Sequence, residues 1–182
     1  MSDNTKIVLS ALLVGLFFLF NRIIPGFHTP WLSLTATFFP VILAAFIMGP
    51  LWAAAVGGLG DIVSALLVPR GAYFFGFTLS WILAGLIYGL FCHRKRNKSN
   101  VALLINLVIA SLIVLVGERV LLTAGWIMML PTNNQAFMAI LWSRAIAFAI
   151  LLPFQVAIMW ATCRFLREPI DRFLVIEEDS DD

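Results

Sequence analysis

The chain has 182 residues, of which 62% are hydrophobic and only 12% are charged, and its formal net charge is +2. Soluble domains carry about a quarter charged residues, so this composition excludes an ordinary soluble enzyme and leaves no room for a separate soluble catalytic domain. We therefore expect one all-α integral membrane domain over residues 1–182.

Hydropathy and helix-breaking residues predict six membrane-spanning helices, since a bilayer core needs about 20 apolar helical residues. The predicted spans cover about residues 7–22, 32–48, 51–68, 76–92, 101–123 and 137–165. Pro25 and Pro30 separate the first two spans, and Gly49-Pro50 forms a tight turn before the third. Pro40 lies inside the second span, where it should kink the helix or mark a break.

An even number of spans places both termini on the same side of the membrane. Eight of the twelve basic residues fall on that side: Lys6, Arg94, Lys95, Arg96, Lys98, Arg164, Arg167 and Arg172. The positive-inside rule then predicts that both termini are cytoplasmic. The loop His93–Lys98, HRKRNK, is too short and too near lipid to indicate nucleic-acid binding, and contact with anionic membrane lipid is its simpler role.

The other four arginines map to the outer half of the predicted helices or to the outer loops: Arg22, Arg70, Arg119 and Arg144. Each alone is compatible with snorkelling to the interface or with an ion pair to Glu118. Four on one side instead favour an anion site, and the planar guanidinium suits a carboxylate because it holds both oxygens.

Asp61 is the carboxylate inside the third predicted span, near mid-bilayer, where a lone charge is costly. It is interpreted either as a structural hydrogen-bond partner for a neighbouring helix or as an acceptor for an amino or amide group of a ligand. Tyr73 and Phe74 follow it, and Trp126 lies in the last outer loop. These aromatic side chains suit an interfacial belt, or a stack on a flat ring.

The sequence lacks the motifs that are typical of several functional classes. The chain has no G-x-x-x-x-G-K-[ST] phosphate loop and no H-E-x-x-H, and its two histidines fall on opposite sides of the predicted membrane. No catalytic triad can be assembled, so we expect no enzyme activity, no metal and no cofactor in this chain. Small residues instead favour close helix packing in spans three and four, and the pair Ala11 and Gly15 in span one offers a small face for a partner helix.

The segment from Gly49 to Gly89 resembles the membrane-embedded S components of energy-coupling factor (ECF) vitamin transporters, most closely their folate-specific branch. The matching residues are Gly49-Pro50, Gly57 to Asp61, Pro69-x-Gly71-x-Tyr73-Phe74-x-Gly76-Phe77-Thr78-Leu79-Ser80 and Leu83-x-Gly85-Leu86-Ile87-Tyr88-Gly89. A weaker likeness extends to Ala11, to Phe39-Pro40, and to Arg144 with Pro153.

The resemblance implies a substrate-binding subunit in a prokaryotic plasma membrane that captures a vitamin, in this branch folate, from outside the cell. It further implies partners: a transmembrane coupling subunit, docked through Ala11 and Gly15, and two ATPase subunits that hydrolyse ATP. The candidate substrate-binding residues, from the residue patterns and from the resembling segment, are Arg22, Asp61, Arg70, Tyr73, Phe74, Thr78, Arg119, Trp126 and Arg144.

The chain departs from the folate branch at Arg70, where a smaller residue is usual, and at Phe75, where a proline is usual. Thr123-Ala124-Gly125 stands before Trp126 where the branch tends to have Asn-Thr-Leu. These departures leave a different vitamin or small aromatic metabolite open as the ligand. A stand-alone solute carrier and a ligand-free structural membrane protein also stay open.

Overall fold

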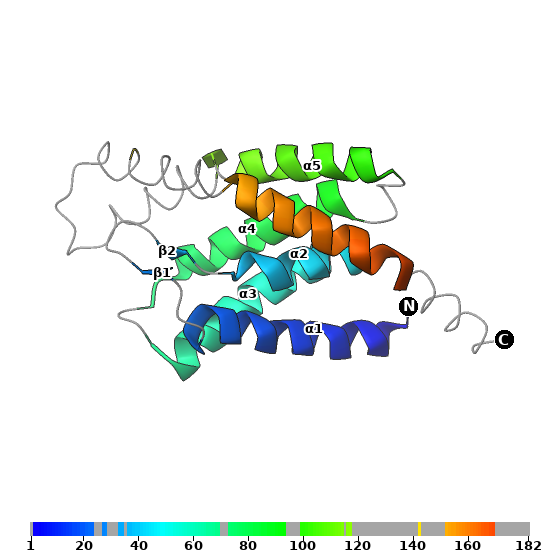
Figure 1. Ribbon diagram of the computed structural model, residues 1–182. Coiled ribbons are helices and arrows are strands. Elements are labelled where there is room, and N and C mark those ends of the chain that lie inside the picture. Colours follow the sequence, from blue (N-terminus) through cyan, green and yellow to red (C-terminus); the bar gives the residue numbers. More distant parts are fainter. Residues whose placement is uncertain are drawn as a thin grey trace.

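The computed structural model is a bundle of helices that lie side by side along one common direction (Figure 1). It describes residues 2–23, 27–28, 33–34, 36–69, 73–93, 99–114, 116–117, 142 and 152–169. Its elements in chain order are α1 (Asp3–Phe18), the π-helical turn η1 (Leu19–Ile23), β1 (Phe27–His28), β2 (Ser33–Leu34), α2 (Phe38–Ile47), α3 (Pro50–Leu67), α4 (Phe75–Cys92) and α5 (Asn100–Ile113). A further helix covers residues 152–169.

Three stretches of the described chain are long and apolar enough to cross a membrane: Asp3–Ile23, α3 and α4. The helices α2 and α5 are apolar but shorter. Most residues between 118 and 151 lie outside the described part, so only portions of the predicted spans 101–123 and 137–165 can be compared with helices. The start of α1 and the end of the helix over 152–169 lie at the same end of the bundle (Figure 1).

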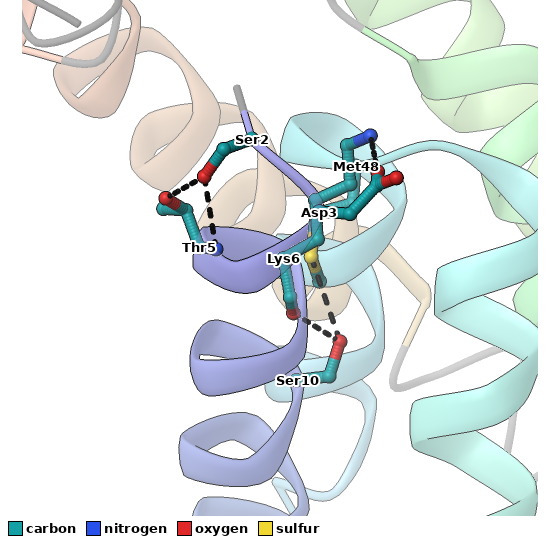
Figure 2. A network of polar contacts seen from close by, with 6 residues as sticks. All are labelled: Ser2, Asp3, Thr5, Lys6, Ser10 and Met48. Atoms are coloured by element: carbon teal, nitrogen blue, oxygen red, sulfur yellow. Dashed lines mark hydrogen bonds and ion pairs between the residues drawn. The ribbon is translucent and has the colours of Figure 1, made fainter.

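A network of polar contacts surrounds the first turn of α1 (Figure 2). Ser2 caps the helix by accepting a hydrogen bond from the Thr5 backbone N–H at 3.3 Å, and Lys6 pairs with Asp3 at 2.7 Å. An acidic residue in a first turn also interacts favourably with the helix dipole. One turn further, the Ser10 hydroxyl contacts the Met48 sulfur at 3.6 Å, which connects α1 to the C-cap residue of α2.

The second span was predicted to begin at Leu32, which is too early. The chain expected to be helical from Leu32 instead contains β2, whose Leu34 pairs with Phe27 of β1 in a short antiparallel ladder. Hydropathy cannot separate a short apolar strand from a helix start, which explains the error. Helix α2 begins at Phe38, so Pro40 lies in its first turn, where no backbone N–H has a partner within the helix. Pro40 therefore marks the break and does not kink the helix.

Helices α3 and α4 pack so closely that glycine is required where they meet. A methyl group at Gly57 would lie 2.7 Å from the Trp81 carbonyl oxygen, and one at Gly85 would lie 2.5 Å from that of Ala53. Gly89 approaches the backbone of Pro50 in the same way. The prediction that small residues in these helices serve internal packing is thus confirmed. In lipid, such close backbone contact replaces the hydrophobic effect as the force that holds helices together.

The helix over residues 152–169 is joined to its neighbours by polar contacts. The Gln155 amide donates to the hydroxyl of the buried Tyr88 in α4 at 3.1 Å. The Trp160 indole N–H donates to the Asn100 carbonyl at 3.2 Å, and Arg167 donates to the Asn100 side chain at 3.1 Å. Interhelical hydrogen bonds of this kind stabilise helix association inside a membrane.

Large apolar side chains are exposed around the bundle. Leu12, Leu51, Leu66, Phe154 and Phe165 are each more than half exposed. Apolar surface this extensive is unfavourable in water, whereas it matches the hydrocarbon core of a bilayer. The outer surface of the described helices is therefore one that faces lipid or another membrane protein.

We predict opposite effects on stability for two glycine-to-alanine changes. Gly85→Ala forces a methyl group against the Ala53 backbone, and overpacking of this kind costs about 1–3 kcal/mol. Gly15→Ala in α1 adds a methyl group that meets nothing within 4 Å, and removing a mid-helix glycine stabilises by roughly 0.5–1 kcal/mol. The measurement is the midpoint of thermal unfolding in detergent. Equal midpoints for both variants would contradict the packing described here.

Candidate ligand-binding site

The candidate site lies at the end of the bundle opposite the N-terminus, where η1, the last turns of α3 and the first turns of α4 meet (Figure 1). Asp61 precedes the end of α3 at Leu67 by six residues, or about 9 Å along the helix axis. Thr78 lies in the first turn of α4, which begins at Phe75. The antiparallel run of α3 and α4 brings these two residues together.

A chain of hydrogen bonds leads from the surface to the Asp61 carboxylate. The Thr78 hydroxyl donates to Asp61 Oδ2 at 2.6 Å, and the Tyr73 hydroxyl lies 2.6 Å from the same Thr78 oxygen. A threonine hydroxyl has one proton, so with that proton on Asp61 the bond to Tyr73 requires Tyr73 to be the donor. Tyr73 is 52% exposed, whereas Thr78 is fully buried. The order Tyr73→Thr78→Asp61 therefore runs from the rim of the bundle inward.

Arg22 is held against the same stretch of α3. Its Nε donates to the Ser64 carbonyl oxygen at 3.1 Å, while the Ser64 hydroxyl donates to the Gly60 carbonyl within α3 at 2.6 Å. Asp61 and Ser64 are three residues apart and thus share one helix face. The bond places the guanidinium beside the turn that carries Asp61. Arg22 therefore contacts the α3 backbone, and its role in an anion site stays a prediction.

Aromatic rings pack around this polar centre. Phe74 lies edge-to-face on Phe77, with ring centroids 5.9 Å apart, and Phe17 of α1 meets Trp81 of α4 in the same geometry at 5.0 Å. Phe74 is half-buried, so part of its surface is used by Phe77. Tyr73 keeps the more exposed ring of the two candidates for stacking on a flat ligand.

The structure brings together four of the nine predicted substrate-binding residues at this end, Arg22, Asp61, Tyr73 and Thr78, with Phe74 beside them. The other four lie outside the described residues: Arg70, Arg119, Trp126 and Arg144. Ser64 was not predicted, because it contributes a backbone carbonyl and a carbonyl has no signature in the residue type. In the described part of the chain, no three His, Cys, Asp or Glu side chains form a group that fits a metal ion.

The two predicted docking residues belong to an apolar surface, unlike the polar centre described above. Ala11 and Gly15 are exposed on α1, in a stripe with Ile7, Val8 and Leu12, which are all more than half exposed. The stripe has small residues at its middle and larger apolar residues on either side. Such a surface permits another helix to approach closely.

Comparison with known proteins identifies the family. Residues 5–161 match the family described as ECF transporter, substrate-specific component. The chain belongs to this family. The resemblance noted from the sequence is thereby confirmed, and so is the class of all-α membrane protein apart from the short β1–β2 ladder.

Individual relatives give more detail. The folate transporter FolT of Clostridium novyi is 27% identical over 166 residues, which are 91% of this chain and 92% of that protein. The folate transporter FolT of Leuconostoc mesenteroides is 32% identical over 163 residues, with 87% and 84% covered. A crystal structure of FolT bound with folic acid superposes with a TM-score of 0.78 at 31% identity, covering 90% of this chain and 94% of that one. The S component of a bacterial ECF transporter shares the fold, with a TM-score of 0.59 at 20% identity and 95% and 99% covered.

Proposed function

We propose that this S component captures folate from outside the cell and delivers it inward as part of an ECF transporter. The observation that carries the proposal is the similarity to a folic-acid-bound FolT structure, which extends over 90% of the chain. Binding of radiolabelled folate to the purified protein tests it. If folate failed to bind while another vitamin bound strongly, the ligand would be a different one.

The chemistry of the candidate site suits folate at both ends of the molecule. The pterin ring presents an amino group beside a ring N–H, and a carboxylate such as Asp61 accepts both. The glutamate tail carries two carboxylates, which guanidinium groups hold well. Arg22 is the described member of the four predicted outer arginines, with Arg70, Arg119 and Arg144 completing the set. Tyr73, Phe74 and Trp126 would stack on the ring.

Six spans with both termini in the cytoplasm, in a prokaryotic plasma membrane, remain the proposed topology. It is supported by the position of the first residue of α1 and the last of the helix over 152–169 at one end of the bundle. Lys6, Arg164 and Arg167 belong to that end, as the positive-inside rule requires for a cytoplasmic face.

ATP hydrolysis is assigned by this proposal to partner subunits and not to this chain. A transmembrane coupling subunit would dock on the exposed stripe of α1 around Ala11 and Gly15, and two ATPase subunits would supply the energy. The small side chains at the middle of the stripe support the assignment, because they let two helices approach closely.

We predict that Asp61→Asn weakens folate binding at least about tenfold, because the amide presents N–H groups where the pterin edge needs an acceptor. Asp3→Asn is the matched control: Asp3 is exposed at the other end of α1 and pairs with Lys6. Both affinities are measured by isothermal titration in detergent. Wild-type affinity in Asp61→Asn would assign Asp61 to helix packing alone.

We predict that Arg144→Ala weakens folate binding about tenfold while it changes the affinity for a pterin without the glutamate tail less than about twofold. The reason is that a guanidinium is expected to contact the tail and not the ring. Competition against radiolabelled folate gives both values. An equal loss for the two ligands would rule out a tail contact at Arg144.

We predict that Ala11→Leu abolishes folate uptake by the complete transporter and leaves folate binding by the isolated subunit unchanged. The larger side chain separates α1 from its partner helix. Ala157→Leu is the matched control, since Ala157 is exposed on the helix over 152–169. Uptake is measured in cells with and without the coupling module. Wild-type uptake in Ala11→Leu would contradict the docking surface, and uptake without any module would indicate a stand-alone carrier.

A further inference from the structure

The one hydroxyl proton of Thr78 is already used in a hydrogen bond within the protein. Thr78 donates this proton to Asp61 Oδ2 and receives the proton of Tyr73, both at 2.6 Å. Its side chain is fully buried at the α3–α4 contact. A ligand that took the Thr78 proton would have to break the bond to Asp61. Thr78 is therefore poorly placed to contact a ligand itself.

The presence of threonine at position 78 still indicates a role for its hydroxyl group. A buried hydroxyl costs free energy unless it is hydrogen-bonded, and valine has nearly the same shape without that cost. Packing alone would thus be satisfied by valine. The hydroxyl is useful where the carboxylate it binds must be kept in one orientation.

We infer that Thr78 and Tyr73 are positioning residues that orient the Asp61 carboxylate toward paired N–H donors on a flat heterocycle. The inference rests on the proposed function and deepens it, because it names the residues that hold the recognising carboxylate in place. A carboxylate has about four acceptor positions on its two oxygens. The bond from Thr78 to Oδ2 uses one of these positions and fixes the direction in which that oxygen points.

Tyr73 connects this orientation to the rim of the site. It lies in the extended segment before α4, where Phe74 has φ −127° and ψ 117°. From there its ring stays exposed while its hydroxyl reaches the buried Thr78. A ring that stacks on Tyr73 and donates to Asp61 thus engages both ends of one hydrogen-bonded chain. Phenylalanine at position 73 would keep the stacking surface and remove the donor.

The test compares two ligands across three variants, Thr78→Val, Thr78→Ser and Tyr73→Phe. The ligands are folate and its analogue with a methyl group in place of the 2-amino group. We expect Thr78→Val to weaken folate binding about tenfold and binding of the analogue less than about twofold. Thr78→Ser should restore folate binding to within about twofold, and Tyr73→Phe should weaken it about threefold.

Thr162→Val is the matched control, because the Thr162 hydroxyl donates to the Ile158 carbonyl of its own helix at 2.8 Å. It should change neither affinity. Equal losses for folate and the analogue in Thr78→Val would show a merely structural role and overturn the inference, as would unchanged folate binding.

Two further outcomes are decisive. If Thr78→Val fails to fold, Tyr73→Phe carries the comparison, and equal losses for its two ligands overturn the inference. If the wild-type protein binds no folate at all, the proposed function fails first. That result is distinguishable, since it is read before any variant is made.

Discussion

The close approach of α3 and α4 is the constraint on which the rest of the structure depends. Gly57 and Gly85 allow each helix backbone to lie against the other, and no larger residue fits at either position. This spacing also sets the distance between the side chains nearer the end that carries the candidate site. The 2.6 Å bond from Thr78 to Asp61 joins the same two helices that these glycines allow to pack closely. Helix packing and the geometry of the candidate site are therefore properties of one helix pair.

Asp61, Arg22 and Asn100 are polar residues of this apolar bundle that each have a hydrogen-bond partner. Asp61 is costly in lipid, yet it receives the Thr78 hydroxyl, and Arg22 donates to a backbone carbonyl of α3. At the other end, Asn100 accepts from the indole of Trp160 and from Arg167. The described helices are thus held by glycine contacts along their middle and by hydrogen bonds toward both ends.

Much of this could be predicted from the sequence, and the failures have physical reasons. The ends of α3 and α4 fall within one residue of the spans expected from hydropathy and from Gly49-Pro50. The start of α2 could not be located, because a two-residue strand has no periodicity. Residue type identified Asp61 and Arg22 as candidates. It could not reveal that Thr78 donates its hydroxyl proton to Asp61, since that depends on the distance between two helices.

The π-helical turn η1 has a consequence for the register of α1. In a straight α-helix, Arg22 would follow Leu12, Gly15 and Leu19 along one stripe, and all three are exposed. Its charge would then face hydrocarbon. The wider turn aligns residues five apart, so Arg22 instead follows the fully buried Phe17 onto α3. The turn thus shifts the register of the helix by one residue and moves a cation from the lipid-facing side to the side that contacts α3.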